Sequence, residues 1–280
     1  QVLKIVVILT ILVCFFHLSA FSQTAKETFL KGNEYLQKGN YQQAITSYQQ
    51  SIKLNPYHKI AYHNLGNCYL NLYLSRNDAK YLVHAEHAFK KALTLDTDYI
   101  SAINKLGVVY EHQKRYKEAW RCYRRVLEIN PVEAEAHYNL ASLFQKNRDF
   151  EKAILYAKRA LKTKPNYVDA LVKLGEIYQK SYHDIDKASM YYKRAKELEP
   201  ENRLVRVCLS EMYAQEGLIE DAERECIEML SLDPLSLSAL SQLVKTYTAQ
   251  GRHEKIGPLC QQIISITPSN NNVLSYSSVL

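Results

Sequence analysis

Signatures of catalysis and of phosphate binding are missing from this sequence. It contains no G-x-G-x-x-G, no P-loop, no H-E-x-x-H and no G-x-S-x-G, the motifs that place glycines, metal ligands or nucleophiles for chemistry. His84 and His87 lie three residues apart, but no third ligand follows at a suitable spacing, so we interpret them as surface histidines. We therefore expect no enzyme, no cofactor and no metal site within these residues.

Linkers and paired cysteines are missing as well. No stretch rich in glycine, serine or proline interrupts the 280 residues, which favours one continuous array over separate domains. None of the six cysteines forms a C-x-x-C pair. Cys226 and Cys260 are one repeat apart, and helices about 8–10 Å apart exceed the Cα separation of a disulfide. We expect the cysteines beyond Cys14 to act as small buried hydrophobic residues.

The N-terminal stretch differs from the rest of the chain. Lys4 precedes residues 5–16, which are apolar except for one threonine, and this run is shorter than the about 20 residues that span a bilayer. Ala20 and Ser22 form an A-x-S cleavage site, so residues 1–22 are predicted to be a secretory signal. The protein is then exported, to the periplasm or the exterior if it is bacterial. An uncleaved, membrane-anchoring segment is the alternative, and either reading implies membrane proximity through residues 1–22.

A pattern of small and apolar residues repeats through the remainder of the chain. Residues 100–133 hold two short amphipathic stretches, because their apolar residues recur at spacings of three and four. The same template fits 34 residues further along, and a period in this range is typical of stacked helical repeats. The template residues are Leu106, Gly107, Tyr110, Ala119, Tyr123, Val126 and Pro131.

Two repeats depart from the template in length. The second repeat has seven more residues between Tyr69 and Ala85, about two helical turns, which we expect to lengthen its second helix. Asn77 and Asp78 would supply the N-cap of that longer helix. The fifth repeat has one extra residue, which we expect in its turn.

These residues resemble the tetratricopeptide repeat family over residues 25–270. The tryptophan that opens the family's repeats is absent, and the seventh repeat departs furthest, with Val244 and Ile256 in place of small residues. The resemblance implies an all-α fold, a right-handed α-solenoid of about seven helix-turn-helix repeats. The expected repeats are 25–58, 59–99, 100–133, 134–167, 168–202, 203–236 and 237–270, followed by 271–280 as a tail or the start of a further repeat.

The family's first helices line a concave groove that often holds an extended peptide. Asparagine offers both a donor and an acceptor, so a ladder of asparagines can bind a peptide backbone whatever its side chains. Residues 63–67 closely resemble the repeats of O-linked N-acetylglucosamine transferase, which carry such a ladder. The alternative is that these asparagines only solvate an exposed surface. The candidate partner-binding residues are Asn33, Asn64, Asn67, Asn104, Lys105, Asn139 and Lys173.

Some family members clamp a C-terminal carboxylate with two asparagines and several basic residues. Asn33, Asn64 and Lys105 match three of those places, but Phe29 and Ser101 stand where lysines would be needed. We therefore expect no complete clamp. Lys105 and a second groove lysine at position 173 would still suit an acidic segment.

Basic pairs recur at one place in four successive second helices. They could align as a stripe that attracts phosphates or anionic lipid. Glu86 and Glu128 lie four residues from Lys90 and Arg124, so we interpret the stripe as a solvated face and expect no nucleic acid. The pairs are Lys90-Lys91, Arg124-Arg125, Lys158-Arg159 and Lys193-Arg194.

The sequence as a whole predicts a non-catalytic scaffold that binds a protein or peptide partner in a concave groove. The alternative is a recruiting or sensory arm of a larger enzyme or signalling protein, of the glycosyltransferase or sensor kinase type. Residues 271–280 motivate this alternative, because they fit the opening of another repeat rather than a polar capping helix.

Overall fold

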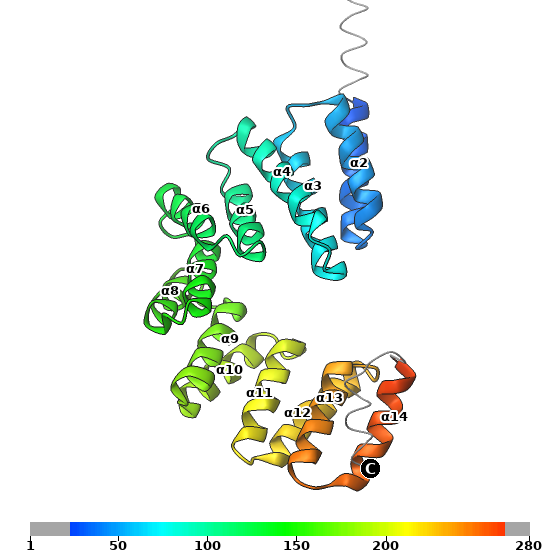
Figure 1. The fold of residues 1–280 in the computed structure, drawn as a ribbon, viewed down its shortest axis with the longest axis vertical. Coiled ribbons are helices and arrows are strands. Elements are labelled where there is room, and N and C mark those ends of the chain that lie inside the picture. Colours follow the sequence, from blue (N-terminus) through cyan, green and yellow to red (C-terminus); the bar gives the residue numbers. More distant parts are fainter. Residues whose placement is uncertain (1–22, 267–280) are drawn as a thin grey trace, which may run out of the picture. The chain divides into compact units, whose positions relative to one another are not determined.

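The structure is a computed structural model that describes residues 23–266. This part of the chain is helical throughout and contains no strand, so the predicted all-α class is confirmed (Figure 1). The chain divides after Leu143 into two compact units, which we call unit 1 and unit 2. The predicted signal at 1–22 and the predicted tail at 271–280 lie outside the described residues.

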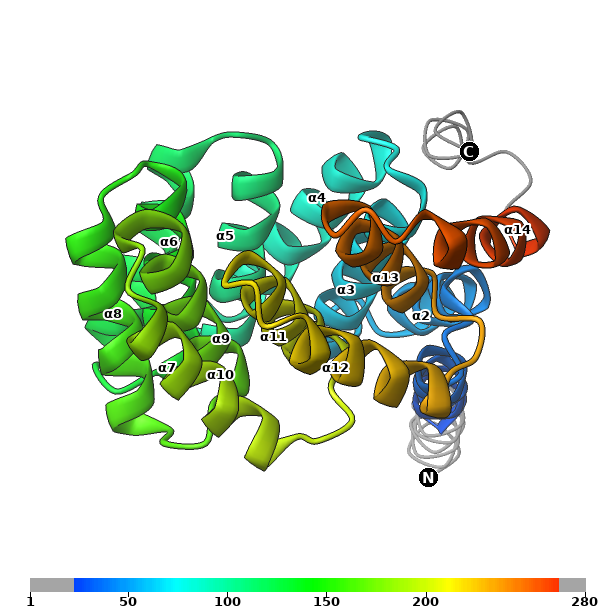
Figure 2. The same ribbon diagram turned by 90° about the horizontal axis from the view of Figure 1, so that it is seen from below.

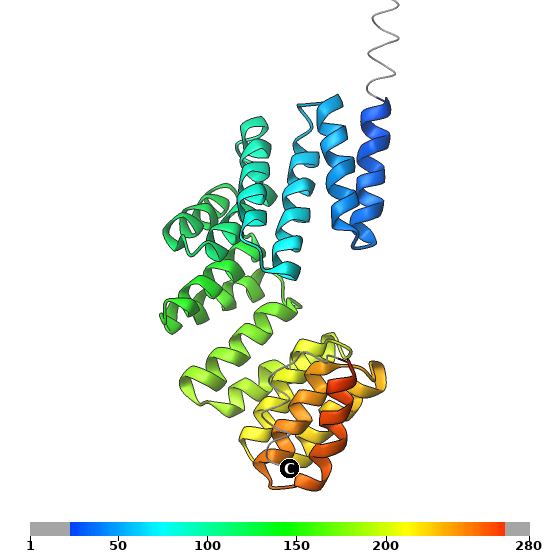
Figure 3. The ribbon, with the colours of Figure 1, turned by 45° about the vertical axis from the view of Figure 1, so that its right-hand side comes forward.

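Unit 1 is a stack of antiparallel helix pairs, each helix packed against the next one in the chain (Figure 3). Proline or a left-handed residue follows most of these helices, because neither continues a helix; the helix that ends at Leu95 has neither. The helices are residues 23–37, α2 (Tyr41–Leu54), α3 (Lys59–Arg76), α4 (Lys80–Leu95), α5 (Ile100–His112), α6 (Tyr116–Ile129) and α7 (Ala134–Lys146), whose last turn holds the unit boundary.

Unit 2 continues the same pattern of antiparallel pairs. Helices α11 and α12, for example, lie side by side (Figure 2). The elements are α8 (Phe150–Thr163), α9 (Val168–Ile177), η1 (Tyr178–Tyr182), α10 (Ile185–Leu198), α11 (Arg203–Gln215), α12 (Ile219–Leu232), α13 (Leu237–Ala249), η2 (His253–Lys255) and α14 (Ile256–Ile266).

The seven-residue insertion lengthens mainly the first helix of its repeat, so the sequence prediction was wrong. Helix α3 has 18 residues against 13 in α5, whereas α4 has 16 against 14 in α6. Asn77 ends α3 in the left-handed conformation at φ 53°, which asparagine tolerates better than most residues. Asp78 follows and accepts a hydrogen bond from the backbone N–H of Lys80 at 3.0 Å. The insertion is therefore divided between the two helices at Asn77.

The extra residue of the fifth repeat lies in a π-helical turn, not in the loop where we expected it. Residues Tyr178–Tyr182 adopt this conformation directly after α9. A π turn absorbs one additional residue within a continuing helix. His183 then ends it at φ 52°, and the backbone N–H of Asp184 bonds to the carbonyl of Tyr178 at 3.0 Å.

Close contact between a glycine and a ring holds the helices of a pair together. A Cβ built on Gly32 would lie 2.6 Å from Cε1 of Tyr48, and one on Gly66 would lie 2.7 Å from Cε1 of Phe89. Both rings are fully buried. The small residue is therefore required because the ring occupies the space that a side chain would need.

The cysteines of the described residues are free thiols. Cys68, Cys208, Cys226 and Cys260 are buried, as predicted, whereas Cys122 is half-buried. Burial raises the pKa of the Cys68 thiol to about 12, which keeps it protonated and unreactive.

Candidate peptide-binding site

The first helices of unit 1 carry most of the predicted binding residues, and Asn33 and Asn64 meet there. Nδ2 of Asn64 donates a hydrogen bond to Oδ1 of Asn33 at 3.1 Å. The hydroxyl of Tyr48, from α2, donates to the same oxygen at 2.7 Å. Both asparagines are half-buried while Tyr48 is fully buried. We call Asn33 and Asn64 the asparagine pair.

A second polar contact lies one turn along α3 from the asparagine pair. Nδ2 of Asn67 donates to Nε2 of His63 at 3.0 Å. Burial, and then the positive charge of Lys105, lower the pKa of His63 to about 4, so its ring is neutral at pH 7. The half-buried Asn67 therefore uses an N–H of its amide internally, as a donor to His63.

Two of the predicted ladder residues are buried rather than open. Asn104 is 1% exposed and Asn139 is 7% exposed. Their Oδ1 and Nδ2 atoms, respectively, are buried without a hydrogen-bond partner among the described residues. A partner segment cannot reach these atoms without a movement of the helices, so the accessible part of the ladder is Asn33, Asn64 and Asn67.

The two predicted groove lysines are engaged in ion pairs. Nζ of Lys105 lies 2.8 Å from Oε1 of Glu135, which comes from α7. In unit 2, Nζ of Lys173 lies 3.3 Å from Oε2 of Glu176 on the same helix. Sequence reasoning missed both carboxylates as partners, although Glu176 is visible at the i+3 spacing.

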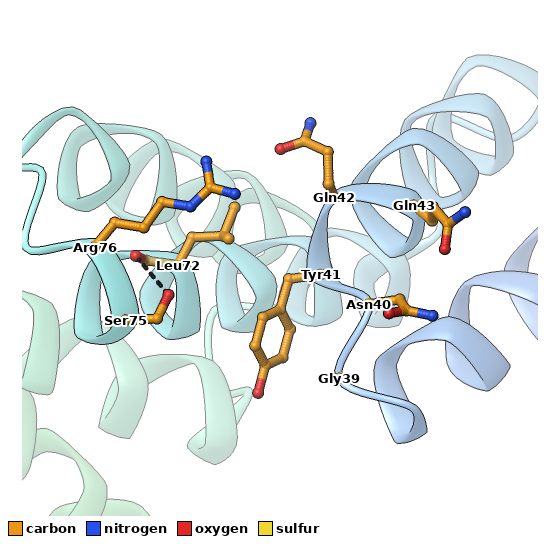
Figure 4. A pocket seen from close by; sticks show the side chains of 8 residues that line it. All are labelled: Gly39, Asn40, Tyr41, Gln42, Gln43, Leu72, Ser75 and Arg76. Carbon is orange, nitrogen blue, oxygen red and sulfur yellow. Dashed lines mark hydrogen bonds between the residues drawn. The ribbon is translucent and has the colours of Figure 1, made fainter. Parts of the chain in front are cut away.

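A hollow of about 480 Å³ lies on unit 1 where α3 extends past the turn before α2. Leu72, Ser75 and Arg76 belong to the lengthened α3, and Tyr41 comes from α2 (Figure 4). Nη1 of Arg76 donates to the hydroxyl of Tyr81 at 3.2 Å. The complete lining is Gly39, Asn40, Tyr41, Gln42, Gln43, Leu72, Ser75 and Arg76. This lining offers one cation, Arg76, among amide, hydroxyl and apolar groups.

The predicted basic stripe is largely compensated where it crosses unit 1. Lys90 pairs with Glu86 at 2.6 Å, and Arg125 pairs with Asp98 at 2.7 Å. The side chains of Lys90 and Arg125 are more than half exposed, where an ion pair contributes little to stability. The stripe thus fits a solvated face.

Metal and membrane sites gain no support from the described residues. Residues 23–266 contain no group of three potential metal ligands, and the His84 ring packs on Tyr69 at 5.1 Å between centroids. None of their helices combines the length and the apolar character that a bilayer span requires.

Known proteins share these repeats. Residues 32–72 match the model described as TPR repeat, and residues 98–166 match the model described as tetratricopeptide repeat. A tetratricopeptide repeat protein from Parabacteroides merdae superposes with a TM-score of 0.66 at 17% identity, covering 92% of this chain and 98% of that one. This match shows the fold alone.

Two curated relatives match about half of the chain each. Anaphase-promoting complex subunit 3 of Schizosaccharomyces pombe is 26% identical over 54% of this chain and 22% of its own length. UDP-N-acetylglucosamine–peptide N-acetylglucosaminyltransferase of Giardia intestinalis is 27% identical over 44% of this chain and 8% of its own length. The similarity thus covers less than a quarter of each relative.

Proposed function

We propose that this chain, which carries tetratricopeptide repeats, is a non-catalytic scaffold that binds an extended segment of a partner protein along the first helices of unit 1. The observation that carries the proposal is the asparagine pair. Its two amide groups are held in one place by two hydrogen bonds, one between them and one from the Tyr48 hydroxyl, yet both asparagines remain half-buried rather than enclosed. Fixed amides on neighbouring helices are suited to a peptide backbone, because each can replace one hydrogen bond that the backbone makes with water.

To test this proposal, peptides are selected from a displayed library for binding to the full chain, and the affinity of a selected peptide is then measured. The double variant Asn33→Ala, Asn64→Ala should bind a selected peptide about 30-fold more weakly, which corresponds to two hydrogen bonds of about 1 kcal/mol each. Asn166→Ala, an exposed asparagine of a turn in unit 2, is the matched control and should bind as the unchanged chain does. Circular dichroism should show equal helicity in all three proteins. Equal affinity of the double variant would exclude the asparagine pair as the binding site.

The alternative function is a recruiting arm of a larger protein. The small share of each relative that is matched, 22% and 8%, is consistent with it, because the matched segment is only a part of a longer chain in both. Intact mass of the native protein decides between the two: a mass close to that of residues 23–280 supports a stand-alone scaffold, and a much heavier species supports the arm. N-terminal sequencing of the same sample tests the proposed export, which requires a species that begins at Gln23.

A further inference from the structure

The hydroxyl of Tyr48 determines which atoms the asparagine pair presents. It donates to Oδ1 of Asn33 at 2.7 Å, and Nδ2 of Asn64 donates to that oxygen at 3.1 Å. Nδ2 of Asn64 also lies 3.4 Å from the Tyr48 hydroxyl oxygen. Burial, opposed in part by the bond from Asn64, raises the pKa of Tyr48 to about 12, so the hydroxyl keeps the proton that it donates.

A side-chain amide has one oxygen and one NH₂ group. In each asparagine of the pair, one of these two groups forms hydrogen bonds within the protein. Oδ1 of Asn33 is occupied by two donors, so its Nδ2 is the group left for a partner. The two N–H groups of Asn64 Nδ2 have two internal acceptors, Oδ1 of Asn33 at 3.1 Å and the Tyr48 hydroxyl oxygen at 3.4 Å, so Oδ1 of Asn64 is left. The pair thus presents one donor and one acceptor. A peptide unit carries the complementary acceptor and donor, whereas a carboxylate has acceptors only and would face the Asn64 oxygen with a second oxygen.

We propose that Tyr48 is a positioning residue that fixes the polarity of the asparagine pair, so that unit 1 binds an internal peptide unit in preference to a C-terminal carboxylate. This inference rests on the proposed function and specifies its ligand.

The neighbouring residues do not favour a carboxylate either. Phe29 stands where a lysine would be needed and carries no charge. Its ring packs on His58 at 4.5 Å and on Tyr48 at 5.8 Å between centroids. Lys105 is paired with Glu135. A free carboxylate would have to compete with that glutamate for Lys105.

The other rings at the place of Tyr48 show that its hydroxyl has a distinct task. Phe89 fills the same position in the second repeat, against Gly66, and has no hydroxyl. In unit 2 the hydroxyl of Tyr192 donates to Oε1 of Gln179 at 3.0 Å, within a buried contact. The ring alone is therefore sufficient for packing, and a phenylalanine at position 48 should fold.

Side-chain amide resonances of the ¹⁵N-labelled full chain test the inference. The probes are N-methylacetamide, which carries one donor and one acceptor, and acetate, which carries acceptors only. The Nδ2 protons of Asn33 should respond to N-methylacetamide at an about tenfold lower concentration than to acetate, at matched ionic strength. In Tyr48→Phe this ratio should fall to about threefold or less, because Asn33 can then rotate its amide.

Tyr192→Phe is the matched control, because it also removes one buried hydroxyl that donates to a side-chain amide oxygen. It should leave the ratio unchanged. A merely structural role of Tyr48 would weaken the response to both probes and keep their ratio. A constant ratio in Tyr48→Phe, or a preference of the unchanged chain for acetate, would overturn the inference.

The two proposals fail in different ways. If library peptides bind and depend on the asparagine pair, but the probes show no preference for the amide, only the polarity is wrong. If neither asparagine responds to any probe and no peptide depends on the pair, the proposed function is wrong and the inference fails with it.

Discussion

Substituting Gly66 with alanine tests the packing that holds the second repeat together. Alanine favours a helix interior over glycine by about 1 kcal/mol, so a free site would gain stability. Here the new Cβ would lie 2.7 Å from Cε1 and 2.8 Å from Cζ of Phe89, whose side chain is 0% exposed. The ring would have to shift by nearly 1 Å to restore ordinary contact, and such overpacking costs about 1–3 kcal/mol. Because the ring has no free space beside it, we expect Gly66→Ala to destabilise unit 1 by about 1–2 kcal/mol.

A double-mutant cycle pairs Gly66→Ala with Phe89→Leu, since leucine lacks both of the ring atoms nearest to the new Cβ. In this background Gly66→Ala should be neutral or stabilising, which reverses its sign. Urea unfolding followed by circular dichroism gives the four free energies, and hydrogen exchange of α3 and α4 localises the change, because repeats can unfold separately. Additive free energies would refute the reasoning, since the two residues would then not share the same space.

Two further predictions concern charged contacts. Arg206→Leu should destabilise unit 2 by about 1.5–3 kcal/mol in urea unfolding, because it removes the buried hydrogen bond to Glu225 at 3.2 Å while Lys196 still pairs with that carboxylate at 2.7 Å. The exposed Arg224→Leu should change the free energy of unfolding by less than about 1 kcal/mol. Burial opposes ionisation of Glu86, but bonds from Lys90, Gln113 and Arg115 outweigh it and lower its pKa to about 2. Glu86 should therefore stabilise the fold above pH 4.5 and lose that contribution as the pH falls towards 2. Because its partners Lys90 and Arg115 are more than a third exposed, we expect this contribution to be about 1 kcal/mol, and in Glu86→Gln acid titration should show no such loss.

The helix periodicity of the chain was predictable from sequence, because apolar residues at spacings of three and four determine which face of a helix is buried. The position of the seven inserted residues was not predictable from the sequence. A seven-residue insertion keeps the buried face in register wherever it falls in a pair of helices, so periodicity cannot decide between α3 and α4. The deciding residue is Asn77, whose left-handed conformation ends α3. Sequence reasoning considered Asn77 only as a start signal for the next helix.

The candidate site was predictable only in part. The spacing of Asn33 and Asn64 placed both on first helices, which the structure has. Their mutual hydrogen bond depends on side-chain reach between neighbouring repeats, which no spacing rule contains. The burial of Asn104 depends likewise on how tightly α5 packs against its neighbours, and the periodicity of a single helix does not determine this.

Tyr48 joins the packing of the repeat to the chemistry of the surface. Its ring fills the space left by Gly32, a task that the ring of Phe89 performs equally well beside Gly66. Its hydroxyl reaches beyond the ring to the asparagine pair and selects which amide atoms remain available. A change from tyrosine to phenylalanine would therefore preserve the repeat pattern and the fold while it alters what the surface can bind. In the sixth repeat, where Ser210 and Cys226 take the corresponding places with their side chains 3.0 Å apart, the same position carries no group that could reach so far. A residue that packing alone would account for, such as Tyr48, can thus also help to determine which ligand the repeat prefers.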